Sequence, residues 1–430
     1  MKVKAFVEAF GKHHRVQEYL SQVQYSGQHI AHFQGLIGSS AAVVLAGIFY
    51  QQTESMLILV PETEEAEFLR SDLEHLLSAN DVLLLPSSFK RPFDVDDVVT
   101  DAVQTRAEVI NKLQHAQHPY IVVSTPEAVV EKVIGTQQFQ KNTFDLKLGQ
   151  TLDLEFLSDF LDSNAFERED FVYEPGQYAI RGGIVDVFSF SHEHPYRIVL
   201  DGSIIESIKT FDIDTQLSHA NIGFLSIVPN INNDEIAGTK VSLFNYFKPG
   251  ASMVLKHFED QYQYLVKQWE NLLDQGHDPA RTWINPGDLK ALLKGQDRLI
   301  EMGVMTAFKP GISLSFNMSP QPMFQKNIEL LLQHLQSNEH QNIMNLVFSD
   351  TGKQIERLLT IIQDREKQIN IVPVYHGLAE GFLDKDLKMA CYTEHQLFER
   401  YYRFKTHKRG YTKSTAMTPV SYTHLRAHET

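Results

Sequence analysis

Apolar residues in the first 150 positions alternate between short continuous runs and helical spacing. Continuous runs occupy Met56–Val60, Val82–Leu85 and Tyr120–Val123, whereas Ala102–Leu113 carries apolar residues at helical intervals. Short runs are typical of buried strands, and the helical period predicts helices packed on them. Thr63, which precedes two glutamates, is predicted to cap a further helix. The alternation indicates an α/β fold with a mainly parallel sheet.

The pattern changes near residue 150. Leu154–Leu161 suits a helix, and the segments Ile184–Phe190, Tyr196–Leu200 and Ile204–Thr210 suit strands. The last two are separated by Asp201-Gly202, and Asp-Gly between two strands is a strong hairpin signal. We therefore expect a small antiparallel insert of α+β type.

Strand and helix signals alternate again from about residue 237. Met253–Leu255 predicts a strand, Phe258–Leu273 a helix that ends before Gly276, and Ile312–Phe316 another strand. Prolines 320 and 322 then mark a boundary. Beyond it, a helix at Phe324–Leu335 opens a further small α/β unit.

The elements divide the chain into six predicted parts. They are a first segment of an α/β domain (1–150), an inserted module (151–236), the domain's second segment (237–322), a small α/β domain (323–395), a connector (396–419) and a tail (420–430). The tail resembles translated sequencing adapter and is interpreted as an artefact, although a genuine disordered tail is the alternative. The connector mixes basic and aromatic residues, and is interpreted as a solvated helix rather than a nucleic-acid strip.

Composition limits the function. The chain has 430 residues, with 39 Lys and Arg against 54 Asp and Glu, a net charge of −15 that argues against wrapping nucleic acid with the whole surface. The single cysteine, Cys391, excludes an internal disulfide and a Cys-based zinc site, and fits a reducing, cytoplasmic location. No apolar stretch approaches the roughly 18 residues that a membrane span needs.

Residues Gly35–Ala42 read Gly-Leu-Ile-Gly-Ser-Ser-Ala-Ala. A phosphate-binding loop reads G-x-x-x-x-G-K-[ST], so Gly35 matches and Gly38 falls within the loop. Ser40 replaces the second glycine, Ala41 the lysine and Ala42 the hydroxyl residue. A methyl group neither neutralises phosphate nor holds Mg²⁺, so the frame predicts a nucleotide fold that no longer binds nucleotide. The alternative is an ordinary Gly/Ser turn before a helix.

Two arginines accompany the turns of the inserted module. Arg181 precedes Gly182-Gly183, and Arg197 follows in the next strand segment. Arginines on rigid strands could hold an acidic partner surface through forked hydrogen bonds. The alternative is internal pairing with Glu174, Asp186 or Glu206, since surface ion pairs are common.

Catalytic and metal-binding sets are not evident. His192 and His194 have the spacing of a ligand pair, but Ser191–Pro195 reads as a hairpin loop, and no third ligand accompanies them. We expect no metal site and no catalytic residue in this chain.

The module's motifs carry a family resemblance. Tyr173–Phe188, Pro195–Arg197 and Thr210–Gln216 together resemble the UvrA-binding module that the excision-repair protein UvrB shares with the bacterial transcription-repair coupling factor. The resemblance implies that Arg181 and Arg197 contact UvrA. The neighbouring Gln177, Tyr178 and Asp186 are weaker candidates for that surface, and all three are expected to act mainly as scaffold.

The same resemblance bears on the Gly35–Ala42 loop. Gly35–Ala42 falls where UvrB has a working phosphate loop and the coupling factor a degenerate one, and Tyr392–Tyr402 also resembles the coupling factor. The resemblance implies that this chain is the amino-terminal, UvrB-like part of a protein of that family. In the family, an RNA-polymerase-interacting domain and an ATP-driven DNA translocase follow this part. RNA polymerase, DNA, ATP and Mg²⁺ would then belong to those missing parts, with UvrA as the partner here and no cofactor.

Two alternatives stay open. One is an ATP-binding repair protein of UvrB or helicase type, which would need a lysine at position 41 and a pair of Walker B acids. The other is a stand-alone UvrA-binding adaptor that was never joined to a motor.

Overall fold

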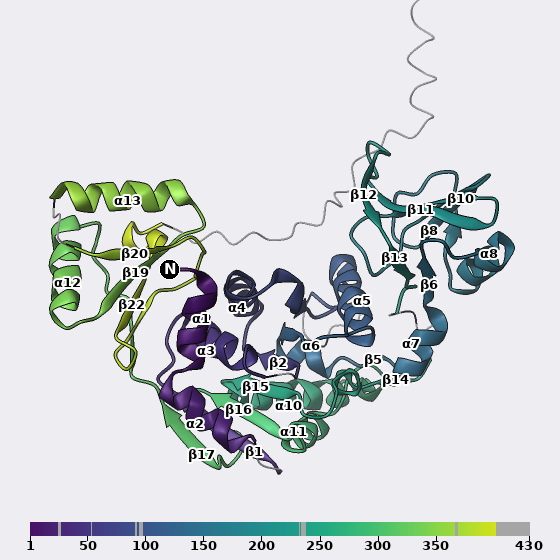
Figure 1. Ribbon diagram of the computed structural model, residues 1–430. Helices are drawn as coiled ribbons and strands as arrows, with labels where there is room; N and C mark the ends of the chain where they lie inside the picture. Colours follow the sequence, from purple (N-terminus) through teal and green to yellow (C-terminus); the bar gives the residue numbers. More distant parts are fainter. Residues whose placement is uncertain are drawn as a thin grey trace, which may run out of the picture.

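The computed structural model describes residues 1–400, apart from 25–26, 53, 91–92, 94–97, 232, 234–237 and 366–368. Figure 1 shows a central domain with a module at its upper right and a small domain at its left. The predicted α/β multidomain class is confirmed. Most of the predicted connector and the whole predicted tail, 420–430, lie outside the described residues.

The central sheet has seven strands, and every neighbouring pair is parallel. In spatial order they are β17 (Ile312–Ser315), β1 (His29–Gln34), β16 (Arg298–Met302), β15 (Ser252–Lys256), β2 (Met56–Leu59), β4 (Ile121–Ser124) and β3 (Val82–Leu85). Strands β2 and β4 are buried along their whole length, which explains their continuous apolar runs. Strands from the two predicted segments interleave, because β15 and β16 lie between β1 and β2.

Helices cover both faces of this sheet. Met56 and Ile58 point into one core, and Leu57 and Leu59 into the other. The first core is closed by α1 (Val3–Gly11), α2 (His14–Gln22), α3 (Ser40–Phe49) and α4 (Thr63–Leu76). The second is closed by α5 (Thr100–Gln114), α6 (Pro126–Val130), α10 (Phe258–Asp274) and α11 (Pro286–Lys294).

Two predicted helix ends can be compared with the structure. Helix α10 ends just before Gly276, whose φ of +80° lies in the left-handed region. The predicted cap at Thr63 is wrong, because Thr63 is already the first residue of α4. Glu62 takes the cap position and makes no side-chain cap bond there.

The module is joined to the central domain by a two-stranded neck. Its strands β6 (Phe144–Lys147) and β13 (Phe224–Ile227) pair antiparallel, so the neck begins before residue 151. Above it lies a six-stranded sheet in the order β12 (Ser218–Ile222), β11 (Ile204–Phe211), β10 (Tyr196–Asp201), β9 (Ile184–Val187), β8 (Gln177–Arg181) and β7 (Glu167–Arg168). Asp201 pairs with Ile204, which makes Gly202 and Ser203 the turn of the predicted hairpin. Helix α8 (Leu154–Ser163) packs on one face of the sheet.

Short elements connect these parts. They are the 3-10 helices η1 (Ala79–Asp81), η2 (Leu243–Tyr246) and η3 (Pro279–Arg281), the helix α7 (Thr136–Asn142), and the paired strands β5 (Val133–Ile134) and β14 (Lys240–Val241).

The small domain has a mixed five-stranded sheet. Its strands are β18 (Met318–Pro320), β21 (Phe382–Asp384), β22 (Met389–Thr393), β19 (Met344–Phe348) and β20 (Ile371–Val374), with helices α12 (Ile328–His340), α13 (Gly352–Arg365) and α14 (Glu394–Leu397). Strand β18 thus precedes the predicted start at 323. The helix predicted at Phe324 begins at Ile328, because the Asn327 side chain accepts from the backbone N–H groups of residues 329 and 330.

Helix α1, which the sequence patterns did not predict, joins the small domain to the central one. Phe6 contacts Phe348 at a ring-centroid distance of 5.0 Å, and Phe10 contacts Phe382 at 5.9 Å. Residues of both domains therefore form one continuous core. Within the described part of the chain, helices long and apolar enough to cross a bilayer are absent.

Candidate functional site

The module's sheet has one face packed on α8 and one outer face. Tyr178, Val185, Ile198 and Ile208 belong to the core with α8. The residues that alternate with them, paired directly across neighbouring strands, form a row on the outer face: Ala179, Asp186, Arg197 and Lys209. Arg181 pairs with Ile184 one step further along the same face. The strand periodicity thus brings Arg181 and Arg197 together.

One buried carboxylate holds both arginines. The side chain of Asp186 is 1% exposed, and it accepts hydrogen bonds from Arg197 Nε at 2.7 Å and Arg197 Nη2 at 2.9 Å. Arg181 Nη2 donates to the same carboxylate. Hydrogen bonding to Asp186 raises the pKa of Arg197. The internal pairing considered from sequence is therefore realised with Asp186, which acts as the expected scaffold.

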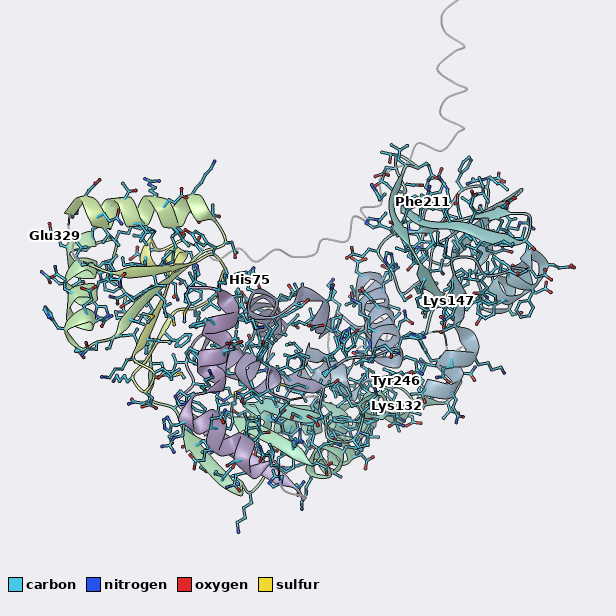
Figure 2. The ribbon with its side chains drawn as sticks, in the orientation of Figure 1. His75, Lys132, Lys147, Phe211, Tyr246 and Glu329 are labelled. Atoms are coloured by element: carbon cyan, nitrogen blue, oxygen red, sulfur yellow. The ribbon has the colours of Figure 1, made fainter. Side chains whose placement is uncertain are left out.

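The two guanidinium groups differ in exposure. The side chain of Arg181 is 37% exposed, and that of Arg197 is 19% exposed. Arg197 also donates to the backbone oxygen of Gln216 at 3.0 Å and lies 4.4 Å from the centre of the Phe211 ring. Figure 2 places Phe211 at the end of the module away from Lys147 and the neck. Arg181 can thus meet a partner directly, whereas Arg197 is largely committed to the module.

Apolar side chains surround these arginines. Phe171 lies under the Arg181 guanidinium, with its ring centre 5.0 Å away, and is 50% exposed. Tyr173, Ile184 and Leu217 are also exposed. Arginine next to exposed aromatic groups is a composition typical of protein-binding surfaces. These apolar residues and Lys209 were not predicted as contact residues, and strand alternation is the sequence signal that could have identified them.

The side chains of Gln177 and Tyr178 are both engaged in hydrogen bonds within the module. Tyr178 is fully buried, and its hydroxyl donates to Asp162 Oδ1 at 2.7 Å. The side-chain oxygen of Gln177 accepts from the backbone N–H groups of Tyr173 and Glu174, each at 2.9 Å. Tyr178 therefore supports the sheet from inside, and Gln177 shapes the turn that leads into β8. Direct partner contact by Tyr178 is not compatible with its burial.

The predicted loop frame lies at a strand-to-helix turn. Strand β1 ends at Gln34 and α3 begins at Ser40, so the strand that the frame requires is present. Gly35 has a φ of +79°, and a Cβ there would come 2.2 Å from the backbone oxygen of Phe316. Ala41 and Ala42 are buried in the first turn of α3. The arrangement has the shape of a phosphate loop without its cation or hydroxyl.

A cavity of about 440 Å³ lies beside this loop. Its two described cations are already paired, Lys256 with Glu65 and Arg400 with Glu394. Glu301, near the end of the strand beside β1, accepts from the backbone N–H groups of residues 307 and 308 and so stabilises a turn. These charges are engaged in the fold rather than directed at a phosphate.

Two histidines and an aspartate lie close enough together to be considered as metal ligands. His13, His14 and Asp386 could offer ligand atoms within 4.8 Å of one another. The two imidazole rings are stacked, with centroids 4.6 Å apart and planes at 22°. An imidazole binds a metal in its own plane at about 2.1 Å, so nearly parallel rings cannot share an ion in this arrangement. His13 Nδ1 also accepts from the backbone N–H of Arg15.

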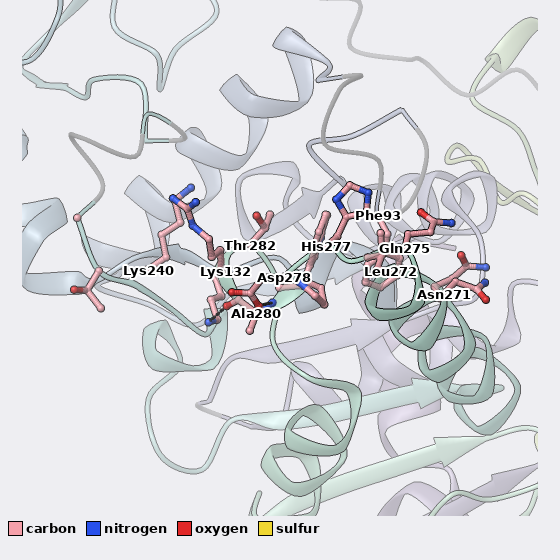
Figure 3. Close-up of a pocket in the computed structure, with 16 residues that line it drawn as sticks. Phe93, Lys132, Lys240, Asn271, Leu272, Gln275, His277, Asp278, Ala280 and Thr282 are labelled. Carbon is pink, nitrogen blue, oxygen red and sulfur yellow. Dashed lines mark hydrogen bonds between the residues drawn. The ribbon is translucent and has the colours of Figure 1, made fainter.

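A further pocket lies elsewhere in the central domain. It has a volume of about 930 Å³ and is bordered by Lys132 and Lys240 (Figure 3). Trp283 also lines it. Lys132 Nζ donates to the backbone oxygen of Ala280, and the ring of Trp283 contacts that of Phe93 in a tilted arrangement, with centroids 5.1 Å apart. Its residues come from segments that are distant along the chain, so no local sequence pattern predicts it. We assign no ligand to this pocket.

Comparison with known proteins agrees with this arrangement. The UvrB interaction domain family matches residues 144–232, a range that begins with β6 and includes both arginines. The chain is 27% identical over 196 residues to the transcription-repair-coupling factor of Bacillus subtilis, which covers 45% of this chain and 16% of that protein. It is 26% identical over 188 residues to the Haemophilus influenzae protein of the same name, covering 44% of this chain and 16% of that protein. It is 24% identical over 194 residues to the Escherichia coli protein of that name, covering 45% of this chain and 17% of that protein.

The chain thus spans about a sixth of the length of the curated relatives it matches. The family match of the module and these similarities agree with the resemblance that the motifs indicated. The chain therefore has a region similar to the transcription-repair coupling factor, and within it residues 144–232 match the UvrB interaction domain family.

Proposed function

We propose that the outer face of the module binds UvrA, with Arg181 as the exposed anchor and Arg197 as its partly buried neighbour. The observation that carries the proposal is the single buried carboxylate of Asp186, which fixes both guanidinium groups on one sheet face. An arginine held in one orientation loses little conformational freedom when it binds, which favours affinity. The family match over residues 144–232 supports the same surface.

In this proposal, the chain recruits UvrA to damage-stalled RNA polymerase during nucleotide excision repair in the cytoplasm. The whole protein would be an ATP-dependent DNA translocase that displaces the polymerase. Contacts with RNA polymerase and DNA, and the ATP and Mg²⁺ chemistry, would belong to domains beyond this chain. The alanines at positions 41 and 42 disfavour an ATP-binding protein of UvrB type, and a nucleotide titration separates the two hypotheses.

The binding test uses Arg181→Ala, because Asp186 keeps its two bonds from Arg197 and the sheet stays supported. We expect affinity for purified UvrA, measured by calorimetry on residues 1–419, to fall about tenfold or more, as for an arginine hot spot. Arg168→Ala, an exposed arginine on β7 of the same module, is the matched control and should bind normally. An Arg181→Ala chain that keeps its fold and its affinity within twofold would overturn the proposal.

A further inference from the structure

A segment of the small domain occupies the space in front of the degenerate loop. Ser39 N donates a hydrogen bond to the backbone oxygen of Glu380 at 3.3 Å, and Ser39 Oγ accepts one from Glu380 N at 2.9 Å. A Cβ added to Gly38 would lie 3.0 Å from the Cβ of Glu380. The backbone of Glu380 therefore lies directly against the loop.

Asp72 of α4 holds the same segment from a second direction. Its Oδ1 accepts from Ala379 N at 2.7 Å, and its side chain also hydrogen-bonds to Ser39. Asp72 is 3% exposed, and Ser39 is 4% exposed. The central domain thus binds three polar groups on two consecutive residues of a peptide backbone: the N–H of Ala379, and the N–H and C=O of Glu380.

The small domain fixes the segment from its own side. His395 Nε2 lies 2.9 Å from the backbone oxygen of Ala379, and the side-chain oxygen of Gln396 accepts from Gly381 N at 2.7 Å. Leu378 is buried in the core that both domains share. The segment is consequently presented to the loop in a fixed conformation.

The chemistry of the loop suits this occupant. In a phosphate loop, backbone N–H groups bind phosphate oxygens, and the lysine neutralises their charge. A peptide carbonyl is a neutral acceptor, so it needs a backbone N–H donor and no cation. Ala41 and Ala42 provide no charge, whereas the turn geometry and the N–H of Ser39 are kept.

We propose that the degenerate loop is an interdomain latch, in which Ser39 and Asp72 bind the Leu378–Gly381 backbone where a phosphate loop would bind nucleotide. Nucleotide is then disfavoured in two ways: the lysine and the hydroxyl are missing, and the backbone oxygen of Glu380 takes the N–H of Ser39 that a phosphate would need. The latch does not depend on UvrA binding and concerns a different part of the chain.

The latch is tested by hydrogen exchange of the Ala379 and Glu380 amides in the whole chain. Ser39→Ala removes one acceptor and should speed exchange at Glu380 about fivefold, the effect of a bond that contributes about 1 kcal/mol. Ser39→Ala combined with Asp72→Ala should speed exchange at both amides by about tenfold or more. Ser21→Ala, an exposed serine on α2, is the control. Unchanged exchange at Glu380 in Ser39→Ala would overturn the latch, and this single variant carries the test if the double variant fails to fold.

The occupancy is tested by restoring the missing chemistry. The side chain of a lysine at position 41 would enter the 440 Å³ cavity, because Ala41 lines it, so Ala41→Lys with Ala42→Ser should fold. We expect no binding of a fluorescent ATP analogue with Mg²⁺ up to millimolar concentration. Nucleotide binding in this variant, with the Ala379 and Glu380 amides still protected, would refute the proposed occupancy.

Discussion

Asp186 offers the sharpest test of how the module holds its arginines. Its carboxylate is 1% exposed and accepts two hydrogen bonds from Arg197, at 2.7 and 2.9 Å. A hydrogen bond to a charged group contributes about 1.5 kcal/mol, so removing both in Asp186→Ala should cost about 3 kcal/mol. Arg181 adds less, because its side chain is 37% exposed and solvent screens the pair. Asp186→Asn keeps one acceptor oxygen and should lose about half as much.

The assay must report on the module itself. Both tryptophans, Trp269 and Trp283, lie in the second core of the central domain, so their fluorescence does not follow the module. Hydrogen exchange of the backbone amides in β9 and β10 does report on the stability of the module. A loss of about 3 kcal/mol corresponds to exchange about 100-fold faster in Asp186→Ala. Asp159→Asn, an exposed aspartate on α8, is the control.

Two results would refute this reasoning. Exchange in β9 and β10 that changes by less than about threefold in Asp186→Ala would mean that the buried ion pair contributes little to the module's stability. Equal exchange in the Ala and Asn variants would mean that the one acceptor oxygen kept by Asn contributes nothing, so that the negative charge of Asp186 is needed for both bonds from Arg197.

Three further predictions concern the central domain. Burial raises the pKa of Asp72 from 3.8 to about 7, so the folded state binds this proton more tightly than the unfolded state does, and the resulting stabilisation is lost as pH rises from about 4 to 7. In urea unfolding followed by tryptophan fluorescence, Asp72→Asn should therefore lose less stability between pH 5 and pH 8 than the unaltered chain. Equal losses would contradict this prediction. In the same assay, Glu131→Ala should lower the free energy of unfolding by about 3–5 kcal/mol, because it leaves the buried Arg106 without its carboxylate partner. A loss below about 1 kcal/mol would show that the Arg106–Glu131 pair does not stabilise the fold. Gly35→Ala should lower the melting temperature more than Gly149→Ala. Both glycines have a φ of +79°, but only a Cβ at position 35 would meet a backbone oxygen, 2.2 Å away. Equal decreases in melting temperature would show that the loop can relax.

The sequence patterns identified most elements of the central sheet. The apolar runs at Met56–Val60, Val82–Leu85 and Tyr120–Val123 correspond to β2, β3 and β4, because strands covered on both faces need no polar positions. The predicted helix Ala102–Leu113 corresponds to α5. Strand β1 was less clear, since His29, His32 and Gln34 interrupt its apolar pattern.

The site was predictable in residue type but not in arrangement. The spacing of Gly182-Gly183 and Asp201-Gly202 placed Arg181 and Arg197 near hairpin turns. Which acid they would share depended on strand register, because only a residue directly opposite Arg197, as Asp186 is, can accept both of its bonds. Register also decided that Tyr178 faces the core, since a shift of one residue would have turned it outward.

By itself, the amino-acid sequence determined the alternation of elements, the uncharged loop at Ala41 and Ala42, and the motif spacing of the module, because these are local properties of neighbouring residues. Only the tertiary structure decided what fills that loop. Ser39 and Glu380 are separated by most of the chain, and their contact depends on how α1 packs the small domain against the central sheet. A contact between such distant segments has no local sequence signal, because it arises from the burial of a shared core.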